Sequence, residues 1–232
     1  MKRLVPRYIQ ITPTLGELSW NLEPSDELLS VHLGWMDWLR KETAGEILDV
    51  RQGFTAVGIR WKTAQSQERF ARTISGVSIP PNPLSQKIWE IPVCYEHEFG
   101  TDLGSVALAK RMRVNDLIDL HSEGIYRIHF FGFLPGFMYL SGLPKVLHTP
   151  RKAVPDRSVA RGSVGIGGSQ TGIYPMESPG GWHVLGRTPV QLFESRQNPP
   201  VWASPGDRIQ FIRIGTEEMK RLLENPVRPT FR

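Results

Sequence analysis

The sequence predicts two domains, an α+β domain over residues 1–82 and an all-β domain over residues 83–232. Mixed helix-like and strand-like apolar patterns fill the first domain. The segment Ile79–Leu84 then places three prolines within four residues, which can neither continue a helix nor enter a central strand. Beyond residue 125 the apolar stretches are short, because eleven of the 22 glycines lie between Gly132 and Gly186. This spacing favours a closed or sandwich-like β structure over repeated βαβ units.

The first domain is expected to hold three strands and two helices. The clearest helix begins at Pro24-Ser25-Asp26-Glu27, because proline suits a first turn and the helix dipole favours acidic residues there. Apolar residues then repeat at spacings of three and four, which indicates a face turned to the core. The other elements are strands over Tyr8–Ile11, Glu46–Arg51 and Phe54–Trp61, with a turn at Gln52-Gly53, and a helix over Thr63–Ile74.

The second domain is expected to begin with a strand, Lys87–Val93, and two short helices. Asp102 is interpreted as the cap of the first helix, which ends near Arg111, and Asn115 as the cap of the second, Asp116–His121. Short strands follow from Ile125 onward. We expect the last strand over Asp207–Ile214 and a final helix, Glu217–Leu223, capped by Thr216.

The composition excludes several classes of protein. The single cysteine, Cys94, excludes an internal disulfide framework and a multi-thiolate zinc site. The N-terminus has no apolar stretch behind its charges, so we expect no signal peptide. No segment approaches the roughly 18 apolar residues of a membrane span. These observations predict a soluble, cytoplasmic protein without a membrane partner.

The net charge of +5 is concentrated in the glycine-rich part of the chain. Residues 145–190 carry six basic side chains and only two acidic ones. These basic residues do not form a stripe along a helix, so they favour a small anion or an acidic partner surface. We therefore expect no nucleic-acid partner.

Several sharper motifs are missing from the sequence. The sequence contains no G-x-x-x-x-G-K-[ST] motif, which excludes a P-loop. No serine has a glycine two residues before it and another two residues after it, which excludes a nucleophile elbow. The six histidines show no H-x-x-x-H spacing, so we expect no zinc or other metal on this chain. Glu96-His97-Glu98 is interpreted as a solvated turn, and Cys94 as a small buried residue.

Two segments could carry chemistry. Aromatic residues flank a Pro135-Gly136 turn within Phe130–Leu140, which indicates either a core cluster or an apolar slot beside a turn. The second segment, Gly162–Pro175, packs glycines around Gln170, and such glycines let backbone N–H groups point together as a nest for an oxyanion. They could instead turn corners in a small barrel, but this alternative leaves the clustered arginines unexplained.

The same segments contain a series of motifs in fixed order. These are Gly132-Phe133-x-Pro135-Gly136-Phe137-x-Tyr139-Leu140, Thr149-Pro150-Arg151, Gly162-Ser163-Val164, Gly168-x-Gln170-Thr171-Gly172-Ile173-Tyr174-Pro175, Ser178-Pro179-Gly180-Gly181-Trp182, Gly186-Arg187-Thr188-Pro189 and Pro205-Gly206-Asp207. The series resembles the family of the 5-oxoprolinase B subunit, which includes the sporulation-kinase inhibitor KipI. That family is also described as allophanate hydrolase subunit 1 or carboxyltransferase domain, subdomain C and D. The resemblance extends from about Ile91 to Ile214, whereas the first 80 residues agree only in length and outline.

The resemblance implies a ferredoxin-like α+β domain followed by a cyclophilin-like β-barrel. It also implies two partners, the homologous barrel C subunit (KipA-like) and the A subunit of 5-oxoprolinase, with which the family opens 5-oxo-L-proline to L-glutamate. ATP is hydrolysed by the assembled complex, and no biotin is expected on this chain. One departure is Val159-Ala160-Arg161-Gly162-Ser163, where family members usually have Val-Pro-Ala-Gly-Ser.

The resemblance and the residue chemistry together give a hypothesis for the site. Cationic forks would bind anionic groups, and N–H donors would stabilise developing negative charge. Arg151 and Arg187 are assigned to the anionic groups, Gln170 to the carbonyl, and His129 either to proton transfer or to the core. The expected substrate-binding positions are Phe133, Phe137, Tyr139, Ser163, Gly165, Gly167, Gly168, Tyr174 and Trp182. The hypothesis requires all of these to converge on one pocket.

Two other functions fit the resemblance. The chain could be an inhibitor that docks on a sensor histidine kinase, with the barrel gripping a peptide turn. It could also be a carboxyltransferase component that accepts carboxybiotin. A biotin carrier would then have to come from elsewhere, because this chain contains no Met-Lys-Met.

Overall fold

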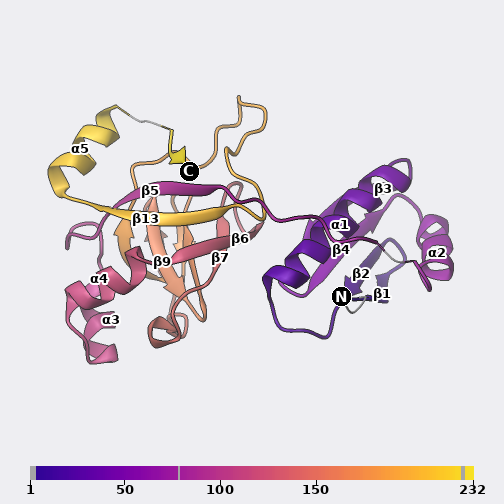
Figure 1. The fold of residues 1–232 in the computed structure, drawn as a ribbon, viewed down its shortest axis with the longest axis horizontal. Helices are drawn as coiled ribbons and strands as arrows, with labels where there is room; N and C mark the ends of the chain where they lie inside the picture. The colour runs from indigo at the N-terminus through magenta and orange to yellow at the C-terminus, as the bar shows by residue number, and fades with distance from the viewer. Residues whose placement is uncertain (1–3, 78, 226–227) are drawn as a thin grey trace. The chain divides into compact units, whose positions relative to one another are not determined.

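The computed structural model describes residues 4–77, 79–225 and 228–232. The chain divides into two compact units, residues 1–84 and residues 85–232 (Figure 1). This division falls two residues beyond the boundary expected from the prolines at 80–83. Within the described ranges, every helix is too short or too polar to cross a lipid bilayer.

The first unit is a four-stranded antiparallel sheet with two helices. The sheet order is β1-β2-β4-β3. The expected strands and helices are confirmed, and β2 was not anticipated because its five residues contain only two leucines and no alternating pattern. The elements are β1 (Arg7–Thr12), β2 (Leu15–Ser19), α1 (Asp26–Glu42), β3 (Ile47–Gln52), β4 (Ala56–Trp61) and α2 (Ala64–Thr73).

Helix α1 begins where the sequence predicted. The Ser25 side chain accepts a hydrogen bond from the backbone N–H of Leu28, as an N-cap does. The apolar stripe of α1 is buried, with Leu28 and Trp35 each 1% exposed. It packs with Val57 and Ile59 of β4 into one core. The core of this unit therefore lies between α1 and the sheet.

The second unit contains a closed seven-stranded barrel. Its order is β12-β9-β10-β7-β6-β13-β5, and β12 pairs with β5 to close it through Arg187 and Cys94. Only the β13–β5 pair is parallel. The barrel strands are β5 (Ile88–Cys94), β6 (Ile125–Phe131), β7 (Met138–Ser141), β9 (Ser163–Gly167), β10 (Gln170–Ile173), β12 (His183–Arg187) and β13 (Arg208–Ile214).

Smaller elements surround the barrel (Figure 1). A separate two-stranded ribbon pairs β8 (Asp156–Val159) with β11 (Ser178–Gly180). The expectation that β13 is the last strand is wrong, because β14 (Thr230–Phe231) pairs with β5. A strand of two residues forms because it pairs with its neighbour, and it is too short to show an alternating apolar pattern in the sequence. The remaining elements are α3 (Leu103–Lys110), α4 (Val114–Ser122), η1 (Lys145–Leu147) and α5 (Thr216–Glu224).

Of the three expected helix caps in this unit, two are wrong and the third is correct in position. The N-cap of α4 is Arg113, and Asn115 lies inside its first turn. The N-cap of α5 is Gly215, and Thr216 is its first residue. Asp102 does stand at the N-cap of α3, but its side chain makes no capping hydrogen bond. Polar residues cluster near helix starts, so sequence alone locates the helix better than the cap itself.

The barrel core contains one buried polar chain. The Tyr95 hydroxyl lies 2.8 Å from His121 Nδ1, and His121 Nε2 lies 2.9 Å from Thr171 Oγ1. Thr171 donates in turn to the Gly165 carbonyl, so its oxygen accepts from Nε2–H. In the neutral imidazole Nδ1 then accepts from the Tyr95 hydroxyl. Burial lowers the pKa of His121 to about 3. Cys94 is buried and free, as predicted.

Candidate functional site

A cluster of aromatic rings lies on the barrel beside β7, β10 and β12. Phe137 is its centre, with its ring centroid 5.5 Å from that of Trp182, 5.3 Å from that of Tyr174 and 4.9 Å from that of Tyr139. These contacts are tilted or edge-to-face, the arrangements that aromatic rings prefer. The cluster is separate from the main barrel core. The cluster is compatible with both interpretations of Phe130–Leu140, because packed aromatic rings can also form one wall of an apolar slot.

Glycines make room for these rings. A Cβ atom on Gly167 would lie 2.6 Å from the Trp182 ring, and one on Gly172 would lie 2.9 Å from it. A Cβ on Gly180 would similarly lie 2.4 Å from the Tyr174 hydroxyl oxygen. Only hydrogen fits at these positions, so the indole lies directly on the strand backbone. The glycine spacing thus serves close packing of aromatic side chains.

A cavity of about 300 Å³ opens above this cluster. Its volume is at the lower end of the range typical for small-ligand sites. Phe133 stands at its rim, 62% exposed and with a φ of 65°. Non-glycine residues rarely adopt this backbone conformation, and it concentrates at functional sites. The cavity is lined by Phe133, Phe137, Tyr139, Arg151, Lys152, Pro155, Tyr174, Pro179, Gly180, Gly181 and Trp182.

Arg151 is the free charge of this cavity. Its guanidinium carbon lies 5.8 Å from the centroid of the Trp182 ring, within the range of a cation–π contact. Among the described residues it has no hydrogen bond or ion pair, and its side chain is exposed. An anion entering the cavity would therefore meet a guanidinium that is already oriented by an aromatic face and has all its donors available.

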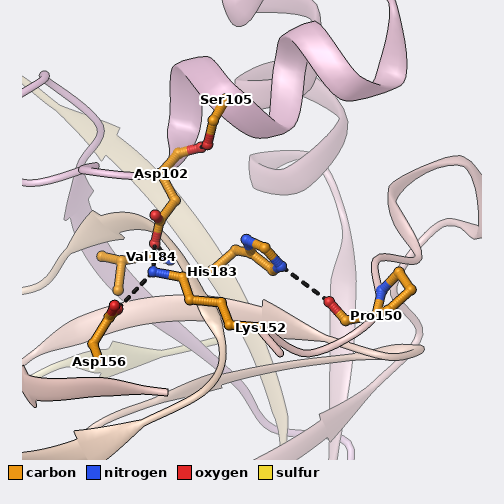
Figure 2. A network of polar contacts seen from close by, with 7 residues as sticks. All are labelled: Asp102, Ser105, Pro150, Lys152, Asp156, His183 and Val184. Carbon is orange, nitrogen blue, oxygen red and sulfur yellow. Dashed lines mark hydrogen bonds and ion pairs between the residues drawn. The ribbon is translucent and has the colours of Figure 1, made fainter. Parts of the chain in front are cut away.

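The segment that carries Arg151, residues 149–156, is tied to the barrel and is called here the Arg151 loop. Thr149 and Gly168 exchange two backbone hydrogen bonds. His183 Nε2 donates to the Pro150 carbonyl over 2.9 Å, as Figure 2 shows. The backbone N–H of Lys152 donates to the Gly181 carbonyl over 2.8 Å. Arg151 is thus held from both sides through its neighbours.

The Lys152 side chain carries a fourth attachment of the loop. Its ammonium lies 2.8 Å from Asp102 Oδ2 and 2.6 Å from Asp156 Oδ2 (Figure 2). Burial lowers the pKa of Lys152, but the hydrogen bonds to Asp102 and Asp156 outweigh it, so the pKa is raised and the group stays charged. Asp102 Oδ2 also accepts the backbone N–H of Val184 over 2.7 Å.

Two phenols in the cavity remain neutral. Burial raises the pKa of Tyr139, partly offset by the nearby charge of Arg151. Burial likewise raises the pKa of Tyr174. Both groups therefore keep their hydroxyl protons and could donate hydrogen bonds to a ligand oxygen.

The structure brings together only part of the predicted site. The predicted residues that line the cavity are Phe133, Phe137, Tyr139, Arg151, Tyr174 and Trp182. The predicted residues outside its lining are His129, Ser163, Gly165, Gly167, Gly168, Gln170 and Arg187. The structure therefore brings the aromatic wall and Arg151 together at this cavity and does not bring the other predicted residues to it.

Arg187 is separated from the cavity by the length of β12. Trp182 directly precedes this strand, and Arg187 is its last residue. The Arg187 Nε donates to the Arg161 carbonyl over 2.7 Å, and Arg187 pairs in register with Ser163. Arg187 and Ser163 therefore lie together at the end of β12 away from Trp182. Arg187 does not line the cavity that Arg151 lines.

Gln170 lies closer to the cavity than Arg187. It pairs in register with Gly167, and it precedes Gly172 by two residues on β10. Alternate residues of a strand share a face, so Gln170 shares the face on which Trp182 rests. Gln170 does not line the cavity.

The predicted oxyanion nest is not formed. Gly165 and Gly167 lie in β9, which pairs with β10 on one side and β12 on the other. The Gly168 N–H donates to the Thr149 carbonyl over 2.7 Å. These glycines therefore serve ladder pairing and aromatic packing. His129 is 2% exposed on β6 and does not line the cavity.

Sequence reasoning missed Lys152, Pro155, Pro179, Gly180 and Gly181 of the lining. Three of these lie within the Ser178–Trp182 motif. The motif therefore included them, but the sequence analysis assigned them no role. Lys152 directly follows Arg151 and could have been found as its neighbour. Asp102 carried no signal, because an acidic residue before a helix is usually a cap.

Metal-ligating side chains and a second cavity also bear on the predicted site. In the ranges that the structure describes, no three His, Cys, Asp or Glu side chains gather in a group that could hold a metal ion. A larger cavity of about 600 Å³ is lined by Trp89 of β5 and by residues within the segments 197–202 and 228–231. It shares no lining residue with the first cavity, and none of the predicted site residues reaches it.

A family model and curated relatives match this chain. The model described as carboxyltransferase domain, subdomain C and D, matches residues 11–203. The 5-oxoprolinase B subunit of Bacillus subtilis (strain 168) is 44% identical over 135 residues, 58% of this chain and 56% of that protein. The 5-oxoprolinase B subunit of Haemophilus influenzae is 50% identical over 128 residues, 55% of this chain and 60% of that protein. The chain thus covers a little over half the length of these relatives.

Solved structures show the same architecture. TTHA0988 superposes with a TM-score of 0.76 at 30% identity, over 86% of this chain and 39% of that one. The urea amidolyase of K. lactis superposes with a TM-score of 0.82 over 100% of this chain and 16% of that one. Because the identity in the second case is 18%, that likeness shows the fold alone.

Proposed function

The chain belongs to the family of the carboxyltransferase domain, subdomain C and D, and from this membership we propose that it is the B subunit of an ATP-dependent 5-oxoprolinase. Such a complex would open 5-oxo-L-proline to L-glutamate. The names of the curated relatives at 44% and 50% identity support this proposal. Because the chain covers 56% and 60% of those relatives, the activity of the whole relative is part of the proposal.

The observation that carries the proposal is the cavity that joins aromatic walls to the free guanidinium of Arg151. 5-Oxo-L-proline is a small ring with one apolar face, one amide and one carboxylate. The aromatic walls suit the ring, and the Arg151 guanidinium suits the carboxylate. The neutral hydroxyls of Tyr139 and Tyr174 could donate to the amide oxygen. The cavity volume of about 300 Å³ leaves room for a ligand of this size.

The chemistry assigned to the complex explains why ATP is needed. A lactam is a planar, stable amide that water attacks very slowly. Transfer of a phosphoryl group from ATP to the lactam oxygen would release ADP and make the ring carbon electrophilic. Attack by water, ring opening and loss of phosphate would then give L-glutamate. In this sequence of steps Arg151 and the aromatic wall bind and orient the ring, and ATP binds to the assembled complex.

The partners proposed are the homologous barrel C subunit and the A subunit of 5-oxoprolinase. Lys152, the cation next to Arg151, is paired with Asp102 and Asp156. Groups for the transferring phosphate would therefore come from a partner. Arg187 and Ser163 lie at the other end of β12, and we do not propose that they contact this ligand.

The two units also support finer fold assignments. In the first unit, β2-α1-β3-β4-α2 follows the ferredoxin-like order, and β1 takes the edge beside β2 that the final strand of that fold would occupy. We propose a ferredoxin-like fold whose edge strand comes from the start of the chain. The closed barrel of the second unit fits a cyclophilin-like assignment.

The experiment that tests the function is reconstitution. The chain is purified alone and with its two proposed partners, and glutamate release from 5-oxo-L-proline is measured with and without ATP. The proposal expects ATP-dependent release only when this chain is present. Release that does not need this chain, or a complex that is active only with carboxybiotin, would overturn it. Lowered autophosphorylation of a sensor histidine kinase by the chain alone would favour the inhibitor alternative.

A further inference from the structure

We propose that Asp102 is a positioning residue for anion binding, which acts through Lys152 to hold the Arg151 loop in place at the cavity. This role concerns the placement of Arg151, and it rests on the proposed function only for the identity of the anion. Asp102 lies at the start of α3, about fifty residues before the loop in the sequence. No sequence motif connects the two positions, but the fold places them in direct contact.

The Asp102 carboxylate departs from the usual role of a helix cap. An aspartate at an N-cap usually accepts a backbone N–H of its own helix. Here it makes no such bond, and Oδ2 instead binds Val184 N–H and the Lys152 ammonium. The first backbone N–H groups of α3 therefore receive no hydrogen bond from the Asp102 side chain, because its carboxylate binds groups of the barrel. Violations of local preference of this kind are expected at functional sites.

Two hydrogen bonds fix Asp102 against the barrel. The backbone N–H of Asp102 donates to the Val184 carbonyl over 2.9 Å, while Val184 N–H donates to Oδ2 over 2.7 Å. Asp102 is therefore held at β12, two residues beyond Trp182. Lys152 and Asp102 side chains are each only 17% exposed, so their ion pair is largely shielded from water. Figure 2 shows the Lys152 ammonium enclosed between Asp102 and Asp156.

The two neighbouring cations of the loop have different roles. Lys152 lines the cavity, but its charge is balanced by two carboxylates. Arg151 is the neighbour whose charge remains available. The backbone is held at Pro150 by His183 and at Lys152 by Gly181 and Asp102, so the position from which the Arg151 side chain extends toward the Trp182 ring is fixed. The loop therefore presents one positive charge at a defined position, and the site selects a ligand with a single negative group.

The test begins with Asp102→Asn, which keeps the size of the side chain and an oxygen for Val184 N–H but removes the charge that holds Lys152. The matched control is Asp116→Asn, because Asp116 is ion-paired on the surface of α4 with Arg113. Amide hydrogen exchange of the full chain is measured by mass spectrometry. We expect exchange in peptides covering residues 149–156 to rise at least tenfold in Asp102→Asn and to stay unchanged in the control.

A second readout separates positioning from general damage. In the reconstituted complex, KM for 5-oxo-L-proline should rise about tenfold or more in Asp102→Asn, while kcat changes less. Inhibition by 2-pyrrolidinone, the same ring without the carboxylate, should change less than twofold, because it has no charge for Arg151 to bind. A purely structural role would weaken both ligands together.

The positioning role and the proposed function fail in different ways. Unchanged exchange at residues 149–156 in Asp102→Asn, or equal weakening of the acid and the neutral ring, would overturn the positioning role. If Asp102→Asn does not fold, Asp156→Asn removes the outer carboxylate only, and the same two readouts apply with a smaller expected change. A wild-type complex that releases no glutamate would remove the proposed function. The exchange result would then still decide whether Asp102 holds the loop.

Discussion

The indole of Trp182 occupies the space that a side chain on Gly167 would need. A Cβ at Gly167 would lie 2.6 Å from Trp182 Cδ1 and 2.7 Å from its ring nitrogen. Real Cβ atoms do not approach a ring so closely, so the two residues are matched as a pair. Trp182 forms one wall of the cavity. The position of this wall therefore depends on the absence of a side chain at Gly167.

Gly167→Ala is expected to displace the Trp182 ring and to deform the cavity. Extra atoms in a packed region usually cost about 1–3 kcal/mol of stability, and Gly167 is fully buried in β9. We expect a loss of that size in the free energy of unfolding, measured with urea. In the reconstituted complex, KM for 5-oxo-L-proline should rise as the wall moves.

Gly104→Ala is the matched control for this substitution. Gly104 lies in α3, and a Cβ there would meet no atom within 4 Å. Alanine is favoured over glycine in helices by roughly 0.5–1 kcal/mol, so this variant should be equally stable or more stable. If Gly167→Ala lowered the free energy of unfolding no more than Gly104→Ala, the close contact between Gly167 and Trp182 would be contradicted.

Arg151→Gln and Arg187→Gln should differ sharply. Arg151 lines the cavity without an ion pair among the described residues, whereas Arg187 lies at the far end of β12. Loss of a charge-assisted hydrogen bond costs roughly 1.5–3 kcal/mol, so KM for 5-oxo-L-proline should rise by about one to two orders of magnitude in Arg151→Gln. It should change less than threefold in Arg187→Gln. Equal effects would contradict the placement of the ligand in this cavity.

Ser25→Ala is expected to destabilise the first unit by about 1 kcal/mol. The Ser25 hydroxyl accepts the Leu28 N–H over 3.1 Å, and alanine leaves that donor without the bond. Asn115→Ala is the comparison, because Asn115 lies inside α4 and does not cap it. Its effect should stay within about 0.5 kcal/mol. Urea unfolding followed by far-UV circular dichroism measures both, and a larger loss at Asn115 would contradict the assigned cap.

Much of the fold could be predicted because local chemistry decides it. Ser25 and the acids that follow it start α1, and the prolines near residue 80 interrupt secondary structure in any context. By contrast, β2 and β14 become strands because β4 and β5 offer them an edge. Such elements depend on partners distant in sequence, and no local pattern announces them.

The site was predictable only as far as its motifs reach. Aromatic residues next to Pro135-Gly136 indicated a wall, and Arg151 indicated an anion. Glycines such as Gly167 were interpreted as donors in a nest, whereas the fold uses them as space for Trp182. Asp102 could not be found at all, because its role appears only when α3 packs beside β12. Close approach and long-range pairing are properties of the folded chain.

Stability should fall between pH 7 and pH 5 because His121 is buried in its neutral form. Burial lowers the pKa of His121 to about 3 in the folded state, whereas an unfolded histidine has a pKa of about 6.5. The unfolded chain therefore binds a proton below about pH 6.5 that the folded chain does not. The His121 contribution is complete above about pH 6.5 and declines as the pH falls toward 3, with a limiting slope of about 1.4 kcal/mol per pH unit.

Urea unfolding at several pH values between 7 and 5 measures this slope in the wild type and in His121→Gln. Glutamine removes the titrating group, so the variant is expected to be less stable at pH 7 but to lose less stability on acidification. His97→Gln is the matched control, because His97 lies in the exposed turn after β5, and its slope should equal that of the wild type. Burial keeps the ring neutral, with Nε2–H donating to Thr171 Oγ1 and Nδ1 left to accept from the Tyr95 hydroxyl. An identical slope in wild type and His121→Gln would show that the folded chain admits a protonated imidazole, which would have to donate from Nδ1 to the Tyr95 oxygen.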